Sequence, residues 1–92
     1  MDNPRSFGWD PAKAARNLVA QDRPAFEAAT RVFLDPERTD HADLRLDYRE
    51  ERRITSGAIE DRLYTIVYTM RDTTTWIISA RPAHRKERRR YG

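Results

Sequence analysis

The sequence predicts an α+β domain in which helices pack on one face of a small antiparallel sheet. Apolar residues recur at helical spacing over residues 12–33, alternate with polar residues over 61–70, and form a β-branched and aromatic run over 75–81. The expected order is strand, helix, helix, strand, strand, strand, helix (β-α-α-β-β-β-α). The 92 residues provide for one core, so residues 1–92 are expected to form a single domain.

A short strand ending near Trp9 and a helix directly after it are the first expected elements. Asp10 is the expected N-cap, and Pro11 suits the first helical position because its φ is already helical and its missing N–H would have no partner there. The face expected to be buried carries Ala12, Ala15, Leu18 and Val19. The face expected to be exposed carries Lys13, Arg16 and Asn17.

A second helix is expected after the stretch "QDRP", because Phe26, Ala29 and Phe33 recur at i, i+3 and i+7. It should stop at the Asp-Pro pair that follows. Residues 37–51 are polar and show no clear period. We expect them to form a long loop that leads into a strand.

Three consecutive antiparallel strands are expected next. The runs "RRITSG" and "DRLYTIVYTM" flank "AIE" and predict a hairpin, and "RDTT" turns the chain into a third strand, "TWIISAR". One face of the middle strand carries Tyr64, Ile66, Tyr68 and Met70, and the other carries Leu63, Thr65, Val67 and Thr69. Because both faces include apolar residues, this strand is expected to lie in the centre of the sheet.

The C-terminal segment carries the positive charge of the chain. A basic helix is expected over 82–91, and residues 81–92 hold six basic residues against one acid, Glu87, whereas the other 80 residues carry a net charge of −2. Such a local patch favours a polyanionic partner over general solubility, although a solvated helix end is the simpler alternative.

Several kinds of chemistry lack their residues. Cysteine is absent, the two histidines, His41 and His84, have no helix-spaced partners, and the three glycines are isolated. We therefore expect no metal, no cofactor and no phosphate-binding loop. No apolar leader or membrane span is recognisable, so a soluble cytoplasmic protein is expected.

The remaining inventory suits RNA cleavage without a metal, in which the 2′-OH of the substrate attacks the adjacent phosphate. Arginine neutralises the charged transition state, because its planar fork binds phosphate oxygens and stays protonated. A carboxylate such as Glu51, or a lysine or tyrosine, could transfer the protons. The alternative is that these Arg and Glu residues form solvated surface pairs.

Five stretches in this order closely resemble the BrnT toxins of type II toxin-antitoxin systems: "FGWDPAKAARNL", "FEAATRVFLDP", "DYREERRITSG", "LYTIVYT" and "IISARPAHRKERRRY". The resemblance implies a RelE-like fold and a bacterial ribonuclease that inhibits translation. It also implies neutralisation by a cognate BrnA-like antitoxin in a heterotetramer. Operator DNA would be bound only through that antitoxin.

The family pattern carries over to Trp9, Asp10, Lys13, Asn17, Asp47, Glu51, Arg52, Ser79, Arg81, Ala83, Glu87 and Tyr91. From these, the candidate catalytic residues are Arg81, Glu51, Arg52, Lys13 and Tyr91. The candidate RNA-binding residues are Arg85, Lys86, Arg88, Arg89 and Arg90. Many relatives have histidines where this chain has Asp22 and Leu46, which would reduce activity if those histidines were essential.

Simpler roles are available for some of these residues. Trp9 and Asp10 suit a core anchor and a helix cap, and Glu87 is placed for an ion pair within its own helix. Arg81 is the strongest catalytic candidate, because its guanidinium is expected to project beyond the end of an apolar strand. Two other functions remain open: a non-catalytic nucleic-acid-binding module that uses the basic helix, and a subunit that only recruits a partner.

Overall fold

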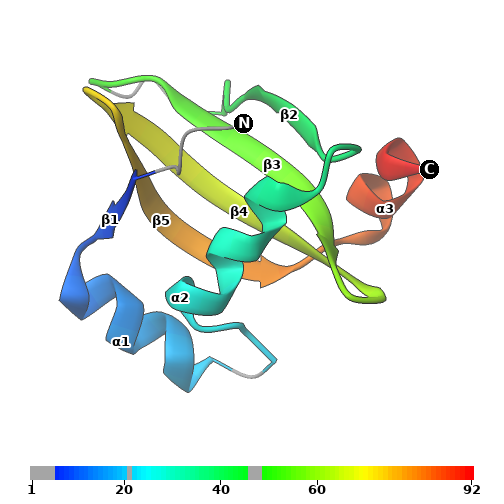
Figure 1. Cartoon of the computed structure of the whole chain (residues 1–92), viewed down its shortest axis with the longest axis horizontal. Coiled ribbons are helices and arrows are strands. Elements are labelled where there is room, and N and C mark those ends of the chain that lie inside the picture. The colour runs from blue at the N-terminus through cyan, green and yellow to red at the C-terminus, as the bar shows by residue number, and fades with distance from the viewer. Residues whose placement is uncertain (1–5, 21, 46–48) are drawn as a thin grey trace.

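A mixed sheet forms the centre of the computed structural model, which describes residues 6–20, 22–45 and 49–92 (Figure 1). Within these residues, five strands lie in the order β1-β5-β4-β3-β2. The strands are β1 (Ser6–Trp9), β2 (Thr39–Ala42), β3 (Arg52–Ile59), β4 (Arg62–Arg71) and β5 (Thr74–Pro82). The helices are α1 (Pro11–Val19), α2 (Phe26–Ala29), the 3₁₀ turn η1 (Thr30–Leu34) and α3 (Arg85–Tyr91).

The α+β class and the central position of β4 are confirmed. β4 pairs antiparallel with β3 on one side and with β5 on the other. Its residues Ile66 and Tyr68 are buried beneath α2 and η1, which lie across the sheet in Figure 1. Phe26 and Phe33 fill the space between the layers, and each side chain buried in this way stabilises the fold by about 1.5–3 kcal/mol.

The expected strand order is incomplete, because β2 lies in the region predicted to be a loop. Residues 39–42 pair antiparallel with β3, from Thr39 opposite Ser56 to Ala42 opposite Arg53. Asp40 accepts hydrogen bonds from Arg38, Arg53 and the Tyr68 hydroxyl, so polar contacts replace the apolar alternation of an ordinary strand. The observed order is β-α-α-β-β-β-β-α, with one more strand than predicted.

The sheet is mixed and not wholly antiparallel, because β1 pairs parallel with β5 from Ser6 opposite Thr74 to Trp9 opposite Ile77. The chain leaves the sheet at Asp10, whose carboxylate accepts the Ala12 N–H at 2.9 Å. This confirms the predicted helix cap. The ring of Trp9 packs edge to face on that of Phe26, with 5.9 Å between the ring centroids, as expected for a core anchor.

The buried face of α1 differs from the prediction. Leu18 and Val19 are 57% and 86% exposed, whereas Asn17 is only 6% exposed. Beyond Ile77, β1 no longer covers β5, and the Asn17 side chain accepts the Ala80 N–H at 3.3 Å. The Ala80 residue is buried there, and a buried backbone N–H needs a hydrogen-bond partner. The contact with Asn17 therefore sets the rotation of α1 and leaves its apolar stripe in solvent.

α3 packs on the opposite face of the sheet from α2, contrary to the expectation of one helical face. Ile66 points toward α2, so its neighbour Thr65 points to the other side, where its hydroxyl donates to Glu87 of α3. α3 begins at Arg85 and not at 82, because β5 continues to Pro82. Among the described residues, no helix has the length and apolar character needed to cross a membrane.

Candidate nucleic-acid interface

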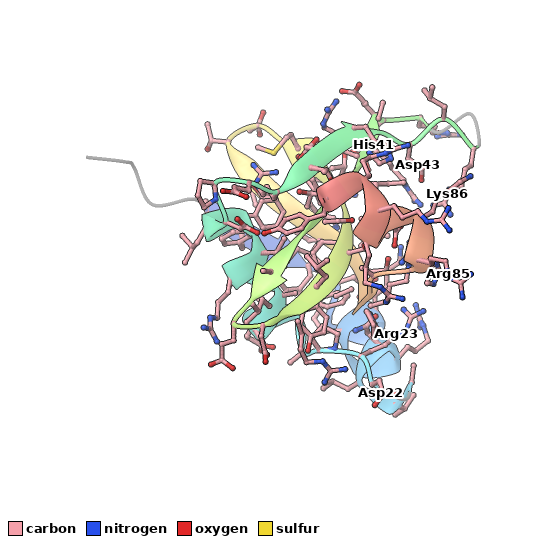
Figure 2. All side chains as sticks on the ribbon, turned by 90° about the vertical axis from the view of Figure 1, so that its right-hand side faces the viewer. Asp22, Arg23, His41, Asp43, Arg85 and Lys86 are labelled. Carbon is pink, nitrogen blue, oxygen red and sulfur yellow. The ribbon has the colours of Figure 1, made fainter. Side chains whose placement is uncertain are left out.

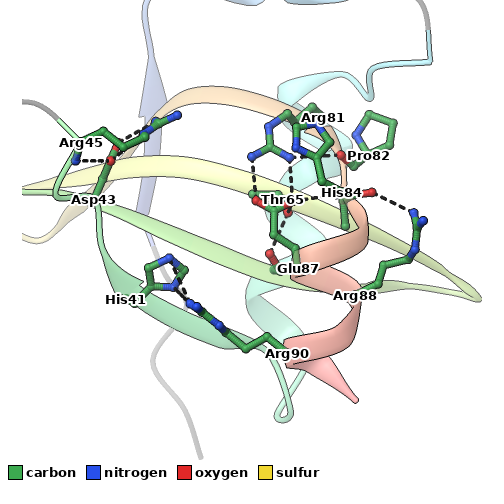
Figure 3. A network of polar contacts seen from close by, with 12 residues as sticks. His41, Asp43, Arg45, Thr65, Arg81, Pro82, His84, Glu87, Arg88 and Arg90 are labelled. Atoms are coloured by element: carbon green, nitrogen blue, oxygen red, sulfur yellow. Dashed lines mark hydrogen bonds and ion pairs between the residues drawn. The ribbon is translucent and has the colours of Figure 1, made fainter.

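Arg81 and Glu87 form an ion pair that joins the end of β5 to α3 (Figure 3). The Nη1 and Nη2 atoms of Arg81 lie 2.8 and 2.7 Å from the two carboxylate oxygens of Glu87. Glu87 also accepts the Thr65 hydroxyl of β4 at 2.9 Å and the His84 N–H at 2.7 Å. The predicted ion pair of Glu87 within its own helix is therefore wrong, because the carboxylate turns to the sheet.

The environment of Glu87 favours its charged form. Burial acts to raise the pKa of Glu87, but the hydrogen bonds from Arg81, the His84 N–H and Thr65 outweigh it and lower the pKa to about 2. The side chains of Arg81 and Glu87 are 17% and 18% exposed, so solvent screens the pair only in part. This pair is an ionised clamp at neutral pH.

The clamp fixes the direction in which Arg81 can still bind. Nη1 also reaches the Pro82 carbonyl at 3.3 Å, which leaves the Nε–H and one Nη2–H without a partner among the described residues. These two N–H groups lie along one edge of the planar guanidinium, the edge with which Arg45 binds Asp43 elsewhere in this chain. Arg81 does not project freely past the strand end, as expected from the sequence; it is held in place with a bidentate edge still available.

A basic cleft of about 260 Å³ lies where α1 meets the uncovered edge of β5, and its lining ends at Ser79, two residues before Arg81. Its lining residues are Lys13, Arg16, Asn17, Arg23, Ile78 and Ser79. Ile78 is the extra residue of a bulge in β5, since Tyr68 pairs with Ile77 and Val67 with Ser79. The described lining includes three cations and no carboxylate, so the cleft attracts anions.

The cations of α3 continue the basic surface. Arg85 and Lys86 lie along the same side of the molecule as Arg23 (Figure 2). Arg88 donates to the Ala83 carbonyl at 2.9 Å, and Arg90 contacts His41 of β2. Segments far apart in the sequence therefore contribute positive charge to one side of the protein.

The other sequence-predicted site residues lie apart from Arg81. Lys13 is in the α1–β5 cleft, whereas Arg52 pairs with Thr69, four residues along β4 from the Thr65 that faces Arg81, or about 13 Å away. Glu51 is exposed at the start of β3, 3.6 Å from Arg53. The structure therefore does not gather the five predicted catalytic residues into one pocket.

Tyr91 lies at the far end of α3. Its hydroxyl donates to the Asp35 carboxylate at 2.6 Å, which fastens the end of the helix to the chain just after η1. This hydrogen bond raises the pKa of Tyr91 to about 12 and lowers that of Asp35. A tyrosine in this state is a poor proton donor at neutral pH.

Asp22 and Leu46 are the two positions at which many of the expected relatives have histidines. Asp22 is exposed and adopts a left-handed φ of 65° in the turn after α1. Leu46 and Asp47 lie outside the described residues.

Sequence reasoning missed Arg16 and Arg23, which line the α1–β5 cleft together with Lys13. Neither spacing nor composition marks them, because they come from α1 and from the loop after it. Asn17 holds Arg23 in the cleft, because its side chain accepts from Arg23 at 3.1 Å and donates to the Pro24 carbonyl at 3.0 Å. Asn17 belongs to the family pattern, and it is the signal in the sequence that points to the cleft.

Comparison with known proteins identifies the family of this chain. A search of curated proteins gave no match. The family model for the ribonuclease toxin BrnT of type II toxin-antitoxin systems matches residues 9–87, a range that includes α1, strands β2 to β5 and the Arg81–Glu87 clamp. The chain therefore belongs to the BrnT family of ribonuclease toxins.

Proposed function

We propose that this toxin is an endoribonuclease that cuts RNA without a metal ion and thereby inhibits translation. The observation that carries the proposal is Arg81: Glu87 holds its guanidinium end-on, and Ser79, two residues earlier on β5, lines a cleft with three cations. A donor fixed in advance stabilises a charged transition state without reorganising during the reaction.

The proposed reaction is an attack by the 2′-oxygen of the RNA on the adjacent phosphorus. A general base takes the proton of the 2′-OH, the P–O bond to the 5′-oxygen breaks, the 5′-oxygen takes up a proton, and a 2′,3′-cyclic phosphate remains on the upstream fragment. Arg81 would bind two non-bridging oxygens through its Nε–H and Nη2–H as negative charge accumulates on them. Lys13, which lines the α1–β5 cleft, is the proton-transferring candidate. Glu51 and Tyr91 lie apart from Arg81 and would contact another part of the RNA strand.

Cleavage is expected to continue in excess chelator and to require a ribose at the cut site, since DNA lacks the 2′-OH nucleophile. The test uses a DNA strand with one ribonucleotide, with the products weighed by mass spectrometry. Cutting after the single ribose, with a cyclic phosphate, is the expected result. Activity that chelator abolishes and Mg²⁺ restores would contradict the mechanism, and binding without cutting would favour the non-catalytic module.

The cations of α3 are proposed to bind RNA phosphates. Replacing Arg88, Arg89 and Arg90 with Gln should reduce the magnitude of the slope of log K against log salt concentration by about 2. Each phosphate contact on a single strand contributes about 0.7 to that slope. The matched control replaces Arg31, Arg49 and Arg62, which are exposed on other segments, and removes the same net charge. Equal salt slopes for the two triple variants would mean that RNA does not bind at Arg88, Arg89 and Arg90.

The partner is proposed to be a BrnA-like antitoxin that forms a heterotetramer with the toxin in the cytoplasm. Membership of a type II toxin-antitoxin family supports a protein antitoxin. The basic surface suits a partner with acidic residues, which would compete with RNA for the same side of the molecule. A RelE-like fold is proposed on the same resemblance, and operator DNA would be bound through the antitoxin.

A further inference from the structure

A second cleft opens between β2 and α3, and in Figure 3 His41 and Arg90 of its lining lie across Glu87 from Arg81. It is lined by His41, His84, Lys86, Glu87 and Arg90, and its volume is about 180 Å³. That volume exceeds the roughly 30 Å³ of a water molecule and falls short of the roughly 300 Å³ at which pockets for drug-sized ligands begin. The cleft therefore suits one compact polar group.

The charge of the cleft is positive. Lys86 and Arg90 are cations, and both histidines can donate from an imidazole nitrogen. Glu87 is the acid in the described lining, but its oxygens already accept from Arg81, Thr65 and the His84 N–H. Its charge is neutralised within the clamp, so the donors of the cleft are left to an outside anion.

The contact between Arg90 and His41 also points to an anion. The Nη1 of Arg90 lies 3.2 Å from Nδ1 and 3.4 Å from Nε2 of His41, and no carboxylate pairs with Arg90 among the described residues. A guanidinium has no acceptor, so His41 can accept from it only through an unprotonated nitrogen. An anion placed between the two side chains would let both donate.

We propose that the β2–α3 cleft is a phosphate-binding subsite, which takes the RNA phosphodiester next to the one that Arg81 contacts. This inference rests on the proposed binding of RNA. The oxygens of a phosphodiester are arranged tetrahedrally around phosphorus, so they can accept from His41, His84, Lys86 and Arg90 in several directions, whereas the two oxygens of a carboxylate lie in one plane. Glu87 forms a wall of the cleft and holds Arg81, so neighbouring phosphates of one strand can occupy both positions.

The test is a titration of the full-length, isotope-labelled protein followed through the imidazole resonances of His41 and His84. Inorganic phosphate and a short single-stranded oligothymidylate, which cannot be cleaved by 2′-OH attack, serve as probes. Both resonances are expected to shift and saturate with the oligonucleotide. If the resonances saturate with inorganic phosphate but not with oligothymidylate, the cleft is a site for the free ion and the RNA assignment is overturned.

Two variants with the same loss of charge sharpen this test. Arg90→Gln is expected to weaken oligothymidylate binding about tenfold, the size of one charge-assisted hydrogen bond, whereas Arg31→Gln, at an exposed position of η1, should have a clearly smaller effect. Thermal melting checks that both variants fold. Equal effects of the two changes would overturn the subsite.

The outcomes separate this inference from the proposed function. Histidine shifts in a protein that never cuts RNA would support the subsite and reject the ribonuclease mechanism. Cutting of RNA without histidine shifts would support the mechanism and reject the subsite. Histidine shifts with the antitoxin, but not with the oligonucleotide, would assign the cleft to an acidic side chain of that partner and also reject the subsite.

Discussion

Arg81→Ala is expected to lower the rate of RNA cleavage about a hundredfold, the usual effect of removing one donor that stabilises a charged transition state. The measurement is single-turnover cleavage, corrected for the folded fraction. Arg81→Lys keeps the charge but loses the planar fork, so it should fold and remain slow. A folded lysine variant that cleaves at the normal rate would contradict the catalytic role.

The alanine variant is also expected to be less stable, since Glu87 would stay partly buried without its main partner. The loss should be about 2–3 kcal/mol. The double change Arg81→Ala with Glu87→Gln removes the uncompensated charge and should recover part of the melting temperature but none of the activity. Recovery of activity in the double variant would show that Arg81 acts only through stability.

Glu87→Gln is expected to destabilise the protein at neutral pH and to lose this effect in acid. Because the pKa of Glu87 falls from 4.5 to about 2 on folding, its contribution is present above pH 4.5 and disappears as the pH falls toward 2. The contribution at neutral pH is at most about 3 kcal/mol. That is a large fraction of the 5–15 kcal/mol typical of a small domain.

Urea unfolding of the wild type and of Glu87→Gln, measured across this pH range, tests the prediction. The difference between the two proteins should narrow as the pH falls, whatever the other carboxylates contribute to both. A difference in the free energy of unfolding that stays constant from neutral pH to pH 2 would mean that the charge of Glu87 does not stabilise the fold.

The sequence predicted the elements whose stability comes from apolar burial. β4 alternates and lies in the centre of the sheet, and the Phe26–Phe33 spacing predicted the helical segment that covers it. β2 was missed because it is an edge strand held through Asp40, and ion pairs leave no period in the sequence. The face of α1 was misplaced because Asn17 satisfies a strand edge that only the tertiary structure creates.

The candidate site was predictable only in part. Arg81 and the basic tail stand out in the sequence, but the partner of Arg81 does not, since Glu87 lies six positions further along the chain, across the junction of a strand and a helix. His41 and His84 look unrelated along the chain and line one cleft in the structure. Such contacts follow from where β2 and α3 lie, and no local spacing encodes them.

Sulfur substitution at the scissile phosphate, combined with Arg81→Lys, tests most directly whether Arg81 contacts the reacting group. Sulfur accepts hydrogen bonds more weakly than the non-bridging oxygen it replaces, so it should slow the wild type. If Arg81 binds both non-bridging oxygens, each phosphorothioate isomer should slow the wild type strongly and Arg81→Lys less, because the two changes remove the same interaction. Equal slowing of the wild type and the variant by both isomers would show that Arg81 does not touch the phosphate.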